Sequence, residues 1–412
     1  MIKYDSLILD NGLKVIVHQD KSTPVVAMNI IYKVGSRDEN PEKTGFAHLF
    51  EHLMFGGSVN IPKYDMPLQN AGGENNAFTN NDFTDYYLTL PKSNIETAFW
   101  LESDRMLSLA FSPKSLEVQR QVVIEEFKQN YLNQPYGDVY LLLKPLAFKK
   151  HPYRWNTIGK DISHIENATM QDVKDFYKKF YNPDNAILSV AGDVNKDEIF
   201  RLAQKWFGEI KKGDNLTRNY TKEDIQTENR ELIVERNVPQ TAIYFAWHMD
   251  KRHSKGFYAC DLISDILSNG NSSRLFSRLV KERKMFSELN AFVSGDLDEG
   301  LFIISGKLIN GYSPEDAEYA IDEQLNELTK KPVSDLELEK VKNKIESNLV
   351  FSRLSVLNKA MNLAYYEMLE SAGLLEKEKD KYNAVSKTDI QQKAKELFAP
   401  GKKNKLVYLA KN

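Results

Sequence analysis

The sequence of 412 residues lacks the features that mark several large classes of protein. It has a single cysteine, Cys260, which excludes an internal disulfide framework and a cysteine-rich metal site. No apolar stretch approaches the roughly 18 residues of a membrane helix, and the charged N-terminal 20 residues do not resemble a secretory signal. The net charge of −3, without a basic stripe interleaved with aromatic residues, argues against a nucleic-acid partner. We expect a soluble cytoplasmic protein with no membrane partner, or a periplasmic one if a signal peptide has been trimmed.

Histidine is also scarce, with 7 residues, yet two of these stand four residues apart, at His48 and His52. The apolar residues around them recur at helical spacing, and Gly56 with Gly57 can end the helix. Because residues i and i+4 project from one face of a helix, both imidazoles can share a metal ion. Glu51 lies beside them and could reach a water molecule on that metal. This is the mirror order of the H-E-x-x-H zinc-protease helix.

The spacing H-x-x-[DE]-H would arise by chance about 0.02 times in a chain of this composition. The alternative is two surface histidines on an amphipathic helix, since a helical histidine is usually solvated or hydrogen-bonded. A third ligand would distinguish the two hypotheses.

A candidate third ligand lies downstream, in a helix that follows Ser112 and Pro113. The pattern predicts helices over residues 95–110 and 115–132. In the second of these, Glu126 shares a face with apolar residues, and an inward carboxylate needs a partner such as zinc. Glu125 is the alternative ligand. Taken alone, this helix favours two solvated glutamates over a metal ligand.

These two stretches resemble the pitrilysin/insulinase family of zinc metallopeptidases, in particular the metal-bearing subunit of enzymes like mitochondrial processing peptidase. The resemblance implies one zinc ion per chain, with His48, His52 and Glu126 as ligands and Glu51 as general base. One position departs from the family pattern: Gln119 stands where a second acidic residue, supporting rather than ligating, is usual.

A run at residues 72–79, which contains Asn76, Ala77, Phe78 and Thr79, follows the first helix. After a turn at residues 80–82, residues 83–90 alternate as a second strand. The resemblance implies that these four residues form an edge strand that binds an extended substrate. Strand addition would hold any extended peptide through backbone hydrogen bonds. The simpler alternative is an ordinary β-hairpin.

The chain is long for one hydrophobic core, so at least two domains are expected. Residues 211–231 are polar and predict a linker. The sequence around Thr169 matches that around Ser386 at an offset of 217, and the run at Pro24 parallels that at Pro239 at an offset of 215. We therefore predict a duplication, with a zinc-bearing catalytic half at residues 1–217, a linker at 218–230 and a metal-free half at 231–412. The resemblance implies an α+β fold, each half a mainly antiparallel sheet with helices packed on it.

The second half lacks the chemistry of the first, because residues 260–267, at the position of the zinc helix, contain no histidine. The family usually has an Arg and a Tyr in this half that bind substrate and stabilise the tetrahedral intermediate. Here Lys281 and Glu288 replace them. We infer that a homologous metal-free subunit supplies the Arg/Tyr pair, or that the chain forms a homodimer.

The predicted function is a zinc-dependent endopeptidase acting on extended peptides or small unfolded proteins, as the metal-bearing subunit of a dimer. The alternative is a non-catalytic structural or peptide-binding subunit of a larger assembly. An intact metal motif favours the enzyme, whereas Lys281 and Glu288 favour the binding subunit.

Overall fold

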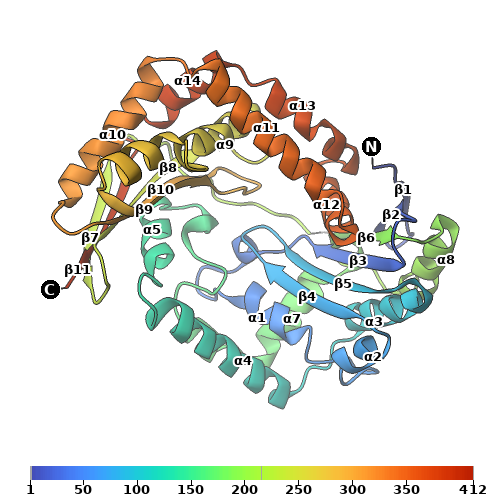
Figure 1. Cartoon of the computed structure of the whole chain (residues 1–412). Coiled ribbons are helices and arrows are strands. Elements are labelled where there is room, and N and C mark those ends of the chain that lie inside the picture. Colours follow the sequence, from blue (N-terminus) through green and yellow to red (C-terminus); the bar gives the residue numbers. More distant parts are fainter. Residues whose placement is uncertain (1, 215, 412) are drawn as a thin grey trace. The chain divides into compact units, whose positions relative to one another are not determined.

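The computed structural model describes residues 2–214 and 216–411, and these divide into two compact units, each built on one β-sheet (Figure 1). The first unit comprises the residues up to Lys128, Trp155–Tyr220 and Leu349–Lys377. The second comprises Gln129–Arg154, Thr221–Asn348 and the residues from Glu378 onward. Residues 1, 215 and 412, which the predicted halves include, lie outside the described residues.

The first unit holds a six-stranded sheet in the order β1-β2-β6-β3-β5-β4. Its strands are β1 (Asp5–Ile8), β2 (Lys14–Gln19), β3 (Val25–Tyr32), β4 (Glu74–Thr79), β5 (Thr84–Pro91) and β6 (Ala186–Gly192). Its helices are α1 (Phe46–Leu53), α2 (Asp65–Asn70), α3 (Ile95–Leu107), α4 (Pro113–Phe127), α6 (Ser163–Glu166), α7 (Met170–Phe180), α8 (Lys196–Phe207) and α12 (Val356–Leu369). Only β2 and β6 pair in parallel, so the sheet is mainly antiparallel, as predicted.

The second unit holds a five-stranded sheet in the order β7-β11-β8-β10-β9. Its strands are β7 (Arg230–Arg236), β8 (Ala242–Met249), β9 (Phe286–Val293), β10 (Gly300–Leu308) and β11 (Asn404–Ala410). Its helices are α5 (Val139–Ala147), α9 (Lys255–Ser268), α10 (Pro314–Lys330), α13 (Glu378–Asn383) and α14 (Lys387–Leu397), together with α11 (Asp335–Ser352), which runs on into the first unit. Here too a single pair, β7 with β11, is parallel.

The two sheets repeat one topology, which confirms the predicted pair of homologous α+β halves. From β2 onward, the first sheet and the second have the same strand order and the same single parallel pair. Helices α7 and α14 both begin with a capping box, at Thr169 and Ser386. The offset is 217 residues for these helices. Carried on to β6 and β11, this offset matches Ile187 to Asn404, and their partners in β3 and β8, Ile31 and Ala246, lie 215 residues apart, the offset predicted for the early run.

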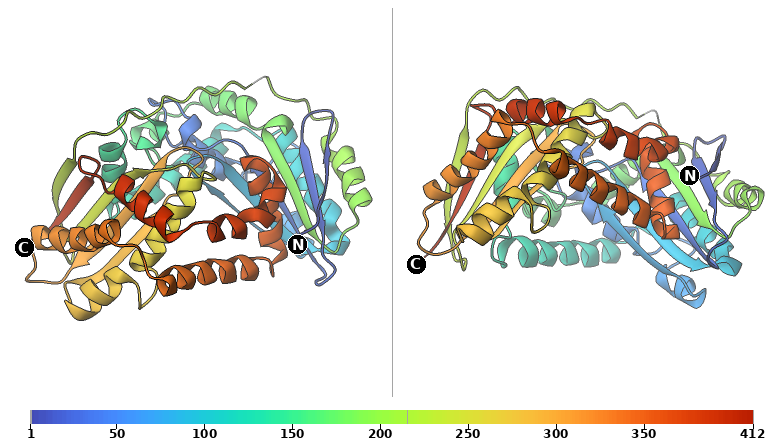
Figure 2. Two further views of the ribbon diagram at one scale, coloured as in Figure 1. Left: turned by 90° about the horizontal axis from the view of Figure 1, so that it is seen from above. Right: turned by 45° about the horizontal axis from the view of Figure 1, so that its top comes forward.

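The halves exchange one helix each, a feature that the sequence did not predict. Helix α12, from the second half, covers the face of the first sheet opposite α1 and buries Val356 and Ala360 against Ala27 and Ala191 (Figure 1). Helix α5, from the first half, packs on the second sheet through Val139, Leu143 and Ala147 (Figure 2). The two helices begin 217 residues apart, so they are equivalent elements of the duplication.

The predicted boundaries at 217 and 231 separate the two sequence repeats, whereas each compact unit groups residues that pack together and includes parts of both repeats. Between Phe207 and Arg230 the described residues form no helix or strand, in keeping with the polar segment at 211–231. One predicted helix ends early, since α3 stops at Leu107 rather than at residue 110. The other reaches its predicted end, because α4 continues after Phe127 as a π-helical turn at Lys128–Leu132.

Hydrophobic segments long enough to cross a bilayer as helices are missing from the part of the chain that the structure describes.

The exchanged helix α12 is tied to the first unit by an ion pair between Lys359 and Asp20, both largely buried. The hydrogen bond from Lys359 holds the pKa of Asp20 well below its usual range. A carboxylate with a depressed folded-state pKa stabilises the fold above its unfolded pKa of about 3.9, and this stabilisation is lost as the pH falls through the folded-state value.

We therefore expect Asp20→Asn to lower the urea midpoint at pH 7 and the difference from the wild type to narrow below about pH 4. Asp5→Asn, which breaks a half-exposed pair with Lys196, is the control and should change the midpoint little at either pH. An unchanged midpoint for Asp20→Asn at pH 7 would show that the pair does not stabilise the docked helix.

Candidate metal centre

Helix α1 has one face buried in the core of the first unit and another face that lies toward α4 and β4. Phe50 at its centre packs against two aromatic rings, Phe176 in α7 and Tyr181 directly after it, with ring centroids 5.3 and 4.6 Å away. The buried residues of the helix are Phe46, Ala47, Leu49, Phe50 and Leu53. Because the remaining positions lie on the other side of the helix, His48, Glu51 and His52 face away from this core, as their spacing predicted.

The N-terminus of α1 is held by a buried carboxylate from a preceding loop. The cap position is Gly45, with φ of 89°, and it offers no side chain to the free amides of the first turn. Glu39 replaces the missing cap: its two oxygens accept hydrogen bonds from the amides of Gly45, at 3.0 Å, and Ala47, at 2.8 Å. Burial raises the pKa of Glu39 to about 8, and these amides oppose the shift. The adjacent Thr44 is held by His164.

Three donor atoms converge on one point beside α1. The Nε2 atoms of His48 and His52 lie 3.3 Å apart, and Oε2 of Glu126 on α4 lies 3.6 and 3.5 Å from them. Ligands about 2.1 Å from a tetrahedral metal ion lie about 3.4 Å from one another. The triangle therefore has the size that a zinc ion requires, and two imidazoles with one carboxylate are a ligand set of catalytic zinc sites.

The geometry clearly distinguishes the two candidate glutamates of α4. Glu126 faces the histidines, whereas Glu125 is exposed and forms an ion pair with Lys128 at 2.8 Å. Over residues 2–214 and 216–411, no other group of three His, Cys, Asp or Glu side chains brings its donor atoms within 4.8 Å of one another.

Burial sets the charge state of the site. It lowers the pKa of His48 to about 4, so the imidazole is neutral at pH 7, which is the form that binds a metal ion. Burial also raises the pKa of Glu51, against the opposing effect of a hydrogen bond from Thr79. The Nδ1 atom of His48 is buried, and no hydrogen-bond partner for it exists among the described residues.

The four residues predicted to form a substrate-binding edge strand do lie in an edge strand, β4, which pairs only with β5. The amide of Ala77 donates to the Asn76 side chain at 2.8 Å, so it points away from β5. Phe78 packs against Phe83, with ring centroids 5.7 Å apart. The hydroxyl of Thr79 instead contacts Glu51, with 2.6 Å between Oγ1 and Oε2.

Sequence reasoning missed Glu39 and the contact between Thr79 and Glu51. Glu39 stands in a polar loop, and nothing in its spacing indicates that it turns back to the helix six residues later. Glu51 and Thr79 belong to different elements, and a pattern within either element cannot reveal a contact between them.

In the second unit, Glu288 lies on the edge strand β9 and is engaged with its neighbours. It forms an ion pair with Lys307 at 2.9 Å and accepts a hydrogen bond from Asn290. Half of its side chain is exposed. Glu288 is therefore a sheet-surface residue.

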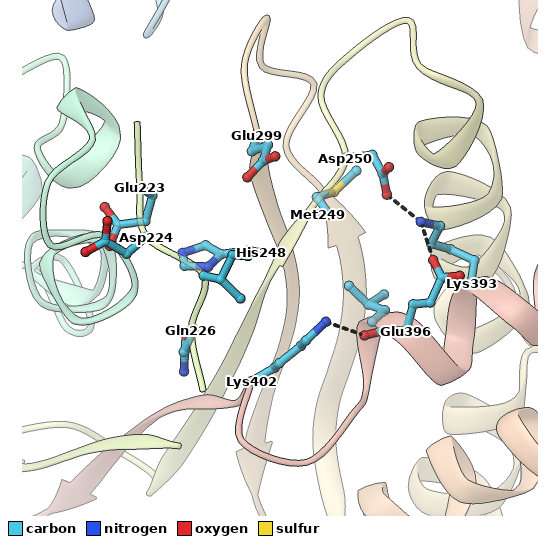
Figure 3. Close-up of a pocket in the computed structure, with 12 residues that line it drawn as sticks. Glu223, Asp224, Gln226, His248, Met249, Asp250, Glu299, Lys393, Glu396 and Lys402 are labelled. Atoms are coloured by element: carbon cyan, nitrogen blue, oxygen red, sulfur yellow. Dashed lines mark hydrogen bonds and ion pairs between the residues drawn. The ribbon is translucent and has the colours of Figure 1, made fainter. Parts of the chain in front are cut away.

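A hollow of about 310 Å³ lies elsewhere in the second unit, between β8 and α14 (Figure 3). Within it, Lys393 forms ion pairs with Asp250 and Glu396, each at 2.8 Å. His248 at its wall donates through Nε2 to a backbone carbonyl at 3.0 Å. We assign this hollow no chemistry.

Comparisons with known proteins agree with this geometry. Residues 14–158 match the profile of the insulinase family (peptidase family M16), and residues 167–345 match that of the peptidase M16 inactive domain. The chain is 32% identical over 350 residues to the zinc protease PqqE of Helicobacter pylori, covering 82% of this chain and 78% of that protein. It is 30% identical over 210 residues to the mitochondrial-processing peptidase subunit beta of Saccharomyces cerevisiae, covering 50% and 45%. A crystal structure of a protease from Helicobacter pylori superposes with a TM-score of 0.94 at 29% identity, covering 99% of this chain and all of that one.

The geometry predicts which α4 glutamate holds the metal. We expect Glu126→Gln to weaken zinc binding at least 10-fold, because a neutral amide replaces the anionic donor, while Glu125→Gln leaves it unchanged. Zinc content after equilibration with a competing chelator, measured by mass spectrometry, checks both variants. Equal zinc retention by the two variants would remove Glu126 from the ligand set.

Proposed function

Because the chain belongs to the insulinase (peptidase M16) family, we propose that it is a zinc-dependent endopeptidase that hydrolyses extended peptides or small unfolded proteins. The observation that carries the proposal is the convergence of His48, His52 and Glu126 on one point, with Glu51 on the same helix face and an open strand edge nearby. One zinc ion per chain would occupy that point.

In this proposal His48, His52 and Glu126 hold the metal and leave its remaining position open. When bound, zinc polarises the scissile carbonyl and lowers the pKa of a water molecule to about 7. Glu51 accepts the proton of the attacking water on its carboxylate and then delivers it to the leaving amine. The buried setting of Glu51 supports this role, because burial raises its affinity for a proton.

The proposed substrate adds as a strand to the outer edge of β4. Asn76, Ala77, Phe78 and Thr79 would then supply the binding edge, through backbone groups that β5 does not use. Such binding requires an extended substrate backbone, so it favours unfolded peptides over folded proteins. The side chains in the flanking pockets would set the preference.

The second half offers no obvious support for the developing oxyanion. Lys281 and Glu288 occupy the positions of the family's Arg and Tyr, and Glu288 is anionic and paired with Lys307. A missing oxyanion donor typically lowers the rate about 100- to 1,000-fold. We propose that a homologous metal-free subunit supplies the Arg/Tyr pair, or that a second copy of this chain completes the site. One similar protein is by name a subunit, the beta subunit of mitochondrial-processing peptidase.

The alternative is a subunit that binds peptides or serves a structural role without cleaving. The departures at Lys281 and Glu288 favour it, and the complete donor set of the first unit opposes it. Peptide binding that survives Glu51→Gln, with no cleavage by the unmutated protein even beside its partner, would support this alternative.

We expect the zinc-loaded chain to cleave a flexible, internally quenched peptide, and Glu51→Gln to abolish turnover while retaining zinc, since it removes the base but no ligand. Fluorescence release and zinc content check the two statements separately. Zinc binding without turnover by the isolated chain would point to the missing subunit, and turnover unaffected by Glu51→Gln would contradict the assigned base.

The edge-strand assignment makes a separate prediction. Ala77→Pro removes an outward-facing amide without breaking a hydrogen bond to β5, so the sheet should persist. We expect KM for a flexible peptide to rise about 3- to 10-fold, the contribution of about one hydrogen bond. Zinc content and the urea midpoint serve as controls, and an unchanged KM with both controls intact would argue against strand addition at this edge.

A further inference from the structure

The predicted general base and the substrate-binding strand are joined by one hydrogen bond. The Thr79 hydroxyl lies 2.6 Å from Oε2 of Glu51 and 3.3 Å from the hydroxyl of Thr84, its cross-strand partner on β5. Thr84 is fully buried and donates its own proton to the carbonyl of Val34, at 2.9 Å.

Two possible acceptors therefore lie within hydrogen-bond distance of the Thr79 hydroxyl. Thr84 can accept the Thr79 proton but cannot donate in return, because its single proton already goes to Val34. The carboxylate of Glu51 is closer and carries charge, and charge-assisted hydrogen bonds are the shorter and stronger ones. Thr79 thus donates to Glu51.

A single loop fixes both partners of this hydrogen bond. The amides of Ser36 and Arg37 donate to the carbonyls of Asn80 and Asn81, in the turn between β4 and β5, at 3.1 and 3.0 Å. Two residues later in the same loop, Glu39 caps α1, the helix that carries Glu51. The turn is also closed from within, since the Asn80 amide donates to the carbonyl of Phe83.

The hydrogen bond from Thr79 restrains one carboxylate oxygen and leaves the other available. Oε2 of Glu51 takes this bond, and Oε1 makes no hydrogen bond to any residue in the described parts of the chain. A general base needs one oxygen aimed at the proton that it removes. A hydrogen bond to one oxygen fixes the torsion of the carboxylate, and this sets the direction in which the other oxygen points.

We propose that Thr79 is a positioning residue for Glu51: its hydroxyl orients the carboxylate so that Oε1 faces the attacking water. This rests on the proposed peptidase function. It also reassigns the Thr79 side chain, which contacts the base, while the Thr79 backbone remains part of the edge strand that takes the peptide. A peptide that orders β4 thereby also orders the base.

The test compares Thr79→Val, which keeps the β-branched shape but removes the hydroxyl, with Thr79→Ser, which keeps the hydroxyl. We expect Thr79→Val to lower kcat about 10- to 100-fold with KM and zinc content unchanged, as is typical for residues that orient active-site groups. Thr79→Ser should recover most of the lost kcat. Thr89→Val, in β5 of the same hairpin, is the matched control and should behave as the wild type, because its hydroxyl contacts only the exposed Glu74.

A kcat of Thr79→Val equal to that of the wild type would overturn the proposal, and so would a loss confined to KM, since that identifies Thr79 as a direct substrate contact. Crystal structures of the zinc-loaded wild type and Thr79→Val provide a readout apart from turnover. The proposal expects one Glu51 carboxylate orientation in the wild type and a turned or doubled one in the variant; an identical orientation in both overturns it. A wild type that binds zinc but cleaves nothing on its own would point to the missing subunit or to the non-catalytic alternative, and the Glu51 orientation would still decide the role of Thr79.

Discussion

The candidate site depends on how α1 is anchored at its first turn. A helix N-terminus leaves backbone amides without partners, and here a glycine with positive φ occupies the cap position. Glu39 satisfies two of the amides with its two oxygens inside the protein, and this fixes the rotation of α1 about its axis. That rotation decides whether His48 and His52 meet Glu126. The same loop holds the β4–β5 turn, so the candidate metal ligands, the proposed base Glu51 and the strand edge share one support.

The second half has the same sheet topology but lacks the candidate metal centre. Helix α9, which includes residues 260–267, contains no histidine, and Asp265, Ser268 and Asn269 lie at its C-terminal end. Asp265 and Asn269 hydrogen-bond to each other. Ser268 accepts from the amide of Ala291 on β9 and donates to its carbonyl, at 2.7 and 2.9 Å. These backbone groups at the sheet edge are thus satisfied internally, whereas in the first unit Glu51 contacts the edge strand through the hydroxyl of Thr79.

The exchange of α5 and α12 gives each sheet its second covered face. A sheet with one open apolar face needs a partner layer, and each half supplies that layer for the other half's sheet. A compact unit therefore requires both halves of the chain. Neither sequence half alone contains all the layers of a unit. The polar segment between the halves therefore does not separate two independent domains.

The sequence by itself determined the elements whose signals are local. Helical spacing placed His48, Glu51 and His52 on one face, alternation marked β5, and the repeated motifs at Thr169 and Ser386 revealed the duplication, because backbone periodicity and capping act over a few residues. The spacing within α4 left Glu125 and Glu126 open, and in the tertiary structure Glu126 faces the histidines, as the family resemblance implied. Tertiary structure alone brought Glu39 to the start of α1 and Thr79 to Glu51, and exchanged the two helices. Each of these is a contact between residues far apart in the chain, and such contacts follow from the packing of whole elements rather than from the spacing within any one of them.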